Sequence, residues 1–134
     1  MPFITFDEKI TVHIEEIDAH HQTLINLIND LHDAVVQGKG EETVSVILPQ
    51  LINYTMYHFF AEEEYMVKYS DPRYFEHKME HAKLIDQTLE LYERYNEGLK
   101  ISDAVLDFLK DWLNNHILGL DIELGHYLIE RHVV

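Results

Sequence analysis

The sequence contains no cysteine, only five glycines and three prolines in 134 residues, and few positive charges. Without cysteine the chain can form no disulfide, no thiolate metal site and no cysteine nucleophile. Ten Lys and Arg stand against 25 Asp and Glu, which gives a formal net charge of -15. Because Lys and Arg drive binding to nucleic acids and to anionic membrane surfaces, we expect neither partner.

The sequence also lacks the segments that would direct it to or through a membrane. No apolar run is long enough to span a bilayer, and the start, MPFITFDEKITVHI, does not follow the basic-then-apolar pattern of a secretory signal. We therefore expect a soluble, cytoplasmic protein. The length is typical of one domain, and we expect a single domain over residues 1–134.

Hydrophobic periodicity predicts an all-α protein with four main helices. These helices are expected over residues 18–37, 41–69, 72–98 and 102–118. Because the connections are short, consecutive helices should form an up-down-up-down antiparallel four-helix bundle. An extended N-terminal arm of about thirteen residues and a short C-terminal helix over residues 122–131 should complete the fold.

The predicted helix ends depend on capping and helix-breaking residues. Asp18, Asp71 and Ser102 are expected to be N-terminal caps. Pro49 should kink the second helix or mark its true start, because proline removes a helical hydrogen bond. Gly119 is expected to end the fourth helix.

Several histidines and one carboxylate occupy positions that should be apolar. The core-facing stripe of each helix follows the alternating spacing of three and four residues, and polar side chains interrupt it. In the first helix, periodicity alone does not choose between His20 and His21 as the inward residue. The other inward polar residues are His58, Glu62, His77, His81 and His116.

Burying this set without partners would be too costly for a small domain. Each unpaired buried polar group costs about 1–3 kcal/mol, and a domain is stable by only about 5–15 kcal/mol. In an antiparallel bundle these positions fall at one level, near the connection over residues 70–73. Metal ions would supply the missing partners, and nitrogen and oxygen donors suit iron, manganese or zinc.

Asp121 adds a second carboxylate, five residues after His116, which a relaxed helix end could return to the same level. Seven donors exceed what one tetrahedral ion needs. Two metal ions bridged by Glu62 and Asp121 would account for all of them. An ion with three imidazoles and an ion with two would leave an open position on the second ion.

The motifs DAHHQTL, HFFAEE, HKMEH and WLNNHILGLD resemble the haemerythrin family, in particular its single-domain bacterial members. The similarity covers essentially the whole chain, and the four motifs in this order form a specific pattern. The family pattern D-x-x-H-x-x-L identifies His21, rather than His20, as the inward histidine. It implies one iron held by His77, His81 and His116, and a second held by His21 and His58.

The resemblance also implies a function. Glu62 and Asp121 would bridge the two irons, Fe2+ or Fe3+, together with an oxo or hydroxo group, and O2 would bind reversibly at the open position. NO and small anions such as azide are further candidate ligands. The alternative is a diiron enzyme, such as an oxidase, peroxidase or nitric oxide reductase. The expected walls of the O2 pocket are Phe59, Trp112, Leu113 and Ile117.

The remaining histidines and acidic residues are expected to lie outside the ligand set. Glu63 and Glu64 should turn outward, and His13 should be a surface residue where relatives commonly have glycine. Phe6 replaces a tryptophan that is usual in the arm of relatives. The histidines expected to face solvent or lie beside the ligands are His20, His32, His126 and His132.

Overall fold

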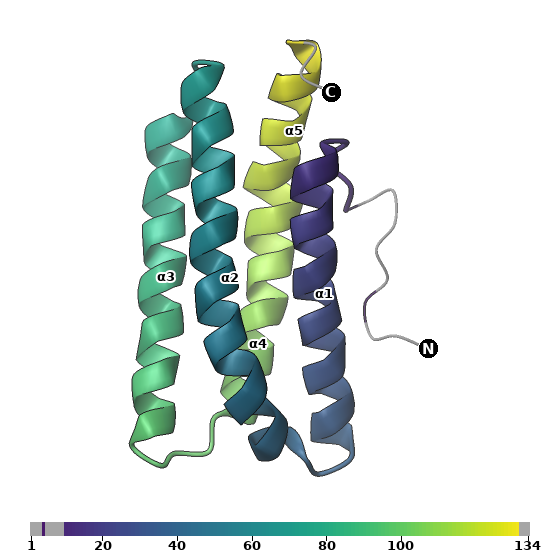
Figure 1. Cartoon of the computed structure of the whole chain (residues 1–134), viewed down its shortest axis with the longest axis vertical. Coiled ribbons are helices and arrows are strands. Elements are labelled where there is room, and N and C mark those ends of the chain that lie inside the picture. Colours follow the sequence, from purple (N-terminus) through teal and green to yellow (C-terminus); the bar gives the residue numbers. More distant parts are fainter. Residues whose placement is uncertain (1–3, 5–9, 132–134) are drawn as a thin grey trace.

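The computed structural model describes Ile4 and residues 10–131, and this part of the chain is helical without a β-strand. The predicted all-α bundle is confirmed (Figure 1). The last three elements follow one another without a break, so they form one column beside three others. The elements are α1 (Glu15–Val36), α2 (Gly40–Lys68), α3 (Tyr74–Asn96), α4 (Ser102–Trp112), the π-helix η1 (Leu113–Asp121) and α5 (Ile122–Glu130).

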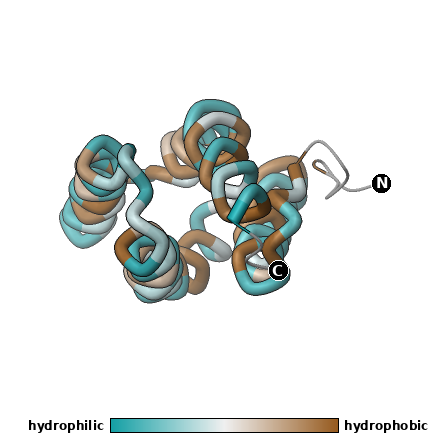
Figure 2. The backbone as a smooth tube through the Cα atoms, turned by 90° about the horizontal axis from the view of Figure 1, so that it is seen from above, coloured by the Kyte–Doolittle hydropathy of each residue, from teal (hydrophilic) through white to brown (hydrophobic). Residues whose placement is uncertain are grey.

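The antiparallel order brings the start of α1, the end of α2, the start of α3 and α5, which directly follows η1, to the same end of the bundle (Figure 1). Seen along the bundle, the columns surround a common interior (Figure 2). Leu24, Ile28, Leu51 and Leu109 are fully buried there. The apolar stripes predicted from the sequence therefore face one another.

The start of α1 differs from the prediction. The helix begins at Glu15, and no side chain caps it. Asp18 instead accepts hydrogen bonds from the backbone N–H of Val12, at 2.8 Å, and from the hydroxyl of Thr11. The carboxylate of Asp18 therefore stabilises the turn between the arm and α1 instead of capping the helix.

The predicted caps of α3 and α4 were also wrong. The first residue of α3 is Tyr74 rather than Pro72, and Asp71 accepts the backbone N–H of Arg73 at 2.9 Å in the preceding turn. At the start of α4 the capping group comes from another helix. Both oxygens of Glu41 accept backbone N–H groups there, from Ile101 at 3.2 Å and from Ser102 at 2.9 Å.

Neither predicted helix breaker interrupts its helix. Pro49 lies inside α2, so it does not mark the start of that helix. Gly119 lies inside η1, which joins α4 directly to α5. The short C-terminal helix expected over residues 122–131 is confirmed as α5, which continues the fourth column without a break.

The described part of the N-terminal arm contacts the bundle. Ile4 exchanges two backbone hydrogen bonds with the side chain of Asn29, at 2.7 and 2.8 Å. Val12 is 2% exposed, whereas His13 is exposed and adopts a φ of 62°. This left-handed conformation favours glycine, which explains why relatives would have glycine there. Phe6 and His132 lie outside the described residues.

None of the described helices is long and apolar enough to cross a membrane.

Candidate metal centre

The seven side chains predicted as metal ligands meet in one buried layer. Each of them is at most 2% exposed. They form two groups, and within each group one donor atom per residue lies within 4.8 Å of the others. The two groups share both carboxylates. The first group is Glu62, His77, His81, His116 and Asp121, and the second is His21, His58, Glu62 and Asp121.

The two oxygens of Asp121 face different histidine groups. Its Oδ1 atom lies 3.0 Å from Nε2 of His77 and 3.1 Å from Nε2 of His116. Its Oδ2 atom lies 2.9 Å from Nε2 of His21. A carboxylate in this orientation can bridge two ions, with one oxygen directed at each.

Glu62 also lies between the two groups. Its Oε1 atom is 3.2 Å from Nε2 of His58 and 3.2 Å from Nε2 of His81. Because His58 belongs to one group and His81 to the other, this carboxylate is the second link between them. The four helical columns therefore each contribute donor atoms to the same layer.

Most of these donor atoms have close neighbours but no aligned hydrogen bond. Among the described residues, both oxygens of Glu62 and Nε2 of His21, His58, His81 and His116 are buried without a hydrogen-bond partner. Each of these four Nε2 atoms lies 2.9–3.2 Å from an oxygen of Glu62 or Asp121 without the geometry of a hydrogen bond. Lone pairs that converge in this way fit metal ions, which need unprotonated imidazoles and carboxylates.

Burial and mutual contacts shift the pKa values of these groups. Burial, followed by the charge of Asp121, raises the pKa of Glu62 well above its ordinary value. Burial also raises the pKa of Asp121, but His116, His21 and His77 outweigh it and hold that pKa well below its usual range. Without a metal, one of the two neighbouring carboxylates therefore keeps its proton, and Glu62 is the one that does so.

Burial disfavours the charged form of the histidines as well. It lowers the pKa of His81 to about 4, against a raising contribution from the hydrogen bond to Glu63. The pKa of His58 is lowered well below its ordinary value, first by burial and then by the charge of His21. Both imidazoles are therefore neutral at neutral pH, which is the form that binds metals.

Two residues outside the predicted ligand set contact the ligand histidines. Oε2 of Glu63 lies 2.9 Å from Nδ1 of His81, so the prediction that Glu63 turns outward was wrong, whereas Glu64 is exposed. Nδ1 of His20 lies 2.9 Å from Nδ1 of His58. His20 is only 8% exposed, so it lies beside the ligands rather than facing solvent. In the sequence, the only indication of this contact was that the helical period of the first helix allowed His20, as well as His21, to face inward.

The four side chains expected to wall an O2 pocket belong to the same hydrophobic cluster. Phe59 stacks on the ring of His81, with centroids 3.9 Å apart and planes 6° apart. The ring centroids of Trp112 and Phe59 lie 5.3 Å apart. Leu113 and Ile117, which follow Trp112 in the sequence, are also buried. The surroundings of the donor layer are therefore apolar and closely packed.

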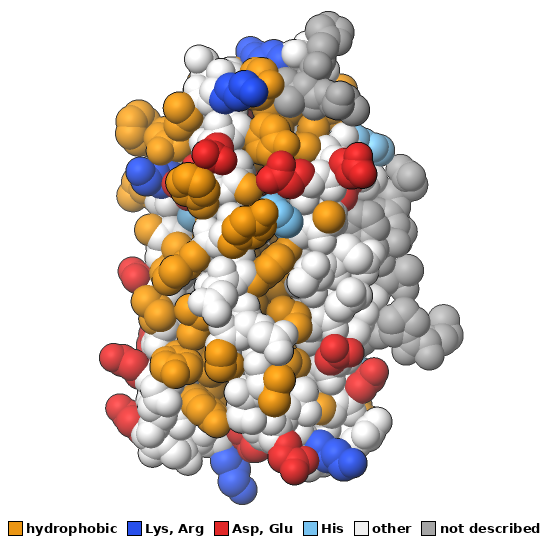
Figure 3. Space-filling model, in the orientation of Figure 1, with side chains coloured by type: hydrophobic (Ala, Val, Ile, Leu, Met, Phe, Trp, Pro, Cys, Tyr) orange, Lys and Arg blue, Asp and Glu red, His pale blue; other side chains and the backbone are white. Residues whose placement is uncertain are grey.

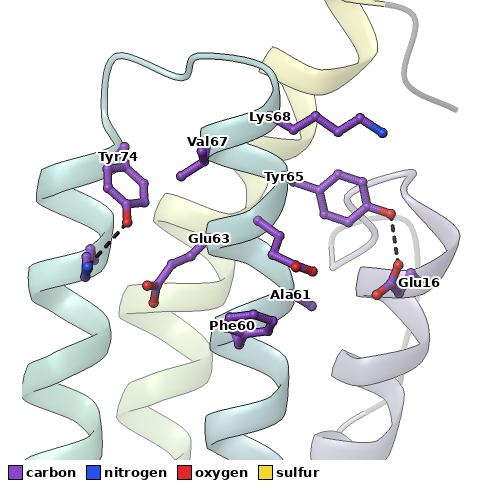
Figure 4. Close-up of a pocket in the computed structure, with 10 residues that line it drawn as sticks. Glu16, Phe60, Ala61, Glu63, Tyr65, Val67, Lys68 and Tyr74 are labelled. Carbon is purple, nitrogen blue, oxygen red and sulfur yellow. Dashed lines mark hydrogen bonds between the residues drawn. The ribbon is translucent and has the colours of Figure 1, made fainter.

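A groove of about 800 Å³ runs along the outside of α2 near this layer (Figure 4). Glu63 lines it, as do Phe60, Val67 and Lys68. Exposed hydrophobic side chains gather over α2 and α3 on this face (Figure 3). Glu63 therefore both lines this groove and contacts His81, a member of the metal-ligand layer.

Comparisons with known proteins give a consistent result. Residues 12–124 match the family described as "Hemerythrin HHE cation binding domain". The chain is 32% identical to a bacteriohemerythrin from Stenotrophomonas maltophilia, covering 90% of this chain and 78% of that protein. A hemerythrin-like protein from Naegleria gruberi is also 32% identical, over 91% and 90% of the two chains. A crystal structure of wild-type hemerythrin superposes with a TM-score of 0.84 at 29% identity, covering 94% and 98%.

Proposed function

The chain belongs to the haemerythrin family, and from this we propose that it binds O2 reversibly at a non-haem diiron centre. The observation that carries the proposal is the division of the donor layer into two histidine groups that share Glu62 and Asp121. A pair of ions bridged by two carboxylates requires this arrangement. Bacteriohemerythrins are among the similar proteins, which supports iron as the metal.

The two ions would have different numbers of protein ligands. His77, His81 and His116 would hold one iron, and His21 and His58 would hold the other, with both carboxylates common to the two. The second iron would then have one protein ligand fewer and an open coordination position. When bound, the iron pair would supply the electrons and the open position that O2 needs.

The protein's own residues would protect this position from water. Phe59, Trp112, Leu113 and Ile117 are at most 7% exposed, and we propose that they form the walls of the O2 pocket. An apolar wall favours uncharged O2 over water and hydrated ions, because it offers a hydrated species nothing to replace its lost hydrogen bonds. Limited access of water and protons would favour release of O2 unchanged.

The test is to load the protein with Fe(II) without air and measure iron content and absorption. We expect two irons per chain and an absorption change with O2 that reverses when O2 is removed. His21→Ala should lose iron, whereas His126→Ala, which changes an exposed histidine, should not. Fewer than two irons in the unaltered protein would contradict the diiron proposal. Irreversible oxidation with release of hydrogen peroxide would favour the diiron enzyme over the carrier.

A further inference from the structure

We propose that His20 is a positioning residue for His58, and that it fixes the tautomer with which His58 binds the two-imidazole iron. This inference rests on the proposed diiron function. Nδ1 of His20 lies 2.9 Å from Nδ1 of His58, which is hydrogen-bond distance. His20 itself belongs to neither group of metal-ligand side chains.

The direction of this hydrogen bond follows from the orientation of the His58 ring. Nε2 of His58 faces the shared carboxylate, 3.2 Å from Oε1 of Glu62, so Nε2 is the atom that would bind iron. An imidazole that binds through Nε2 keeps its proton on Nδ1. His58 must therefore donate, and His20 must accept through an unprotonated Nδ1.

Aromatic side chains hold the His20 ring in place for this role. The ring of Tyr57 lies edge-on to it at 5.1 Å, and that of Tyr54 at 5.9 Å. The rings of His20 and His58 are nearly perpendicular, at 89°, with centroids 5.0 Å apart. The acceptor is therefore held by packing, as a precise ligand geometry requires.

Glu63 has the equivalent position at the other ion. Its Oε2 atom lies 2.9 Å from Nδ1 of His81, a predicted ligand of the three-imidazole iron. A carboxylate increases the donor strength of the imidazole it contacts more than a neutral ring does. The two irons would therefore differ in their outer acceptors as well as in their number of imidazoles.

Two substitutions separate the acceptor role of His20 from its packing. His20→Asn keeps an acceptor, because the side-chain oxygen of asparagine occupies nearly the same place as Nδ1 of histidine. His20→Leu fills the space but cannot accept. Gln22→Ala is the matched control, because Gln22 is exposed on the same helix and contacts only Asn26 among the contacts described.

Co(II) titration of the metal-free protein provides a measurement that does not depend on O2 chemistry. The unaltered protein and Gln22→Ala should bind two equivalents. In His20→Leu the affinity for one equivalent should fall about 10- to 100-fold, the usual effect of losing such an acceptor. His20→Asn should restore most of it. Glu63→Leu should weaken the other equivalent, and the double variant should weaken both, because each substitution removes the acceptor of a histidine that would bind a different ion.

Proton NMR of the Zn(II)-loaded protein reports the tautomer directly. The Nδ1 proton of His58 should give a protected resonance in the unaltered protein and in His20→Asn, and should lose protection in His20→Leu. Unchanged affinity and protection in His20→Leu would overturn the role of His20, as would a His20→Asn variant as weak as His20→Leu. Failure of the unaltered protein to bind two Co(II) ions would instead contradict the proposed diiron centre.

Discussion

Nε2 of His116 lies 3.1 Å from Oδ1 of Asp121, although the two residues are five positions apart along one helical column. In an α-helix, with about 3.6 residues per turn, positions i and i+5 lie on different faces. The π-helix η1, Leu113–Asp121, brings them to the same face, because its hydrogen bonds run from i to i+5. The local change of helix type therefore places the second shared carboxylate.

This geometry predicts opposite effects for two glycines in the same column. Gly119 lies inside η1, and an added Cβ would meet no atom within 4 Å. Gly119→Ala should therefore raise the free energy of unfolding by about 0.5–1 kcal/mol, because alanine has less conformational entropy to lose in a helix. Denaturation with urea measures the change.

Gly125→Ala is the comparison for that variant. A Cβ at Gly125 would lie 2.5 Å from the backbone oxygen of Val12, so the arm or α5 would have to move. We expect the free energy of unfolding of this variant to fall by about 1–3 kcal/mol, as at other overpacked sites. A destabilised Gly119→Ala with an unaffected Gly125→Ala would contradict both assignments.

The sequence predicted the buried faces well, because a helical period is a local property. In the third helix, five residues of the expected stripe are the complete set of buried residues in α3, and the sixth, Tyr95, is half-buried. The five are His77, His81, Leu84, Thr88 and Leu91. The antiparallel order of the helices was also sufficient to predict that the polar residues lie at the same height along the bundle. The structure brings all seven expected donors into the two groups, and their binding of iron stays a prediction.

The helix ends could not be predicted in the same way, because they depend on contacts with distant segments. Asp18 contacts the arm, and the start of α4 is capped by Glu41 from another helix. Nor does the spacing of His116 and Asp121 reveal a π-helix, since a curled helix end was an equally good explanation. For His20, helical periodicity left open whether the side chain faces solvent or lies beside the ligands. For Glu63, periodicity indicated the outward face, and only the structure shows its contact with His81.

Glu41 should contribute to stability through the cap that it provides for α4. Glu41→Ala would leave the backbone N–H groups of Ile101 and Ser102 without their carboxylate partner. We expect a loss of about 1 kcal/mol in the free energy of unfolding, the usual effect of losing an N-terminal cap. Glu42→Ala removes the neighbouring exposed charge and serves as the control. Equal losses in the two variants would indicate a general effect of charge instead of a cap.

The two shared carboxylates should respond differently to neutral substitution in the metal-free protein. Glu62 keeps its proton because burial raises its pKa, so Glu62→Gln should change stability little. Asp121 is ionised beside three histidines, and Asp121→Asn would remove the charge that they stabilise. This substitution should therefore lower the free energy of unfolding by about 1–3 kcal/mol. Both variants should bind fewer metal ions, as measured by metal analysis after loading. Equal stability losses would show that the two carboxylates do not differ in protonation.

The metal-free protein should also lose stability in acid, and the sign follows from the buried histidines. His81 has a pKa of about 4 when folded and an ordinary value of 6.5. Unfolded chains therefore bind the additional proton as the pH falls below 6.5, which favours unfolding by roughly 3 kcal/mol over this interval. The lowered pKa of His58 acts in the same direction.

Glu62 opposes this trend, because its raised pKa makes the folded form bind a proton before the unfolded form does. Because two histidines act against one carboxylate, we expect the free energy of unfolding of the metal-free protein to fall between pH 6.5 and about 4. Urea denaturation at a series of pH values measures it. His81→Gln should reduce the slope, whereas His126→Gln, at an exposed position, should keep it. A free energy of unfolding that rises on acidification would mean that proton uptake by Glu62 outweighs proton uptake by the histidines. In that case Glu62→Gln, which lacks this proton, should lose stability more steeply in acid than the unaltered protein.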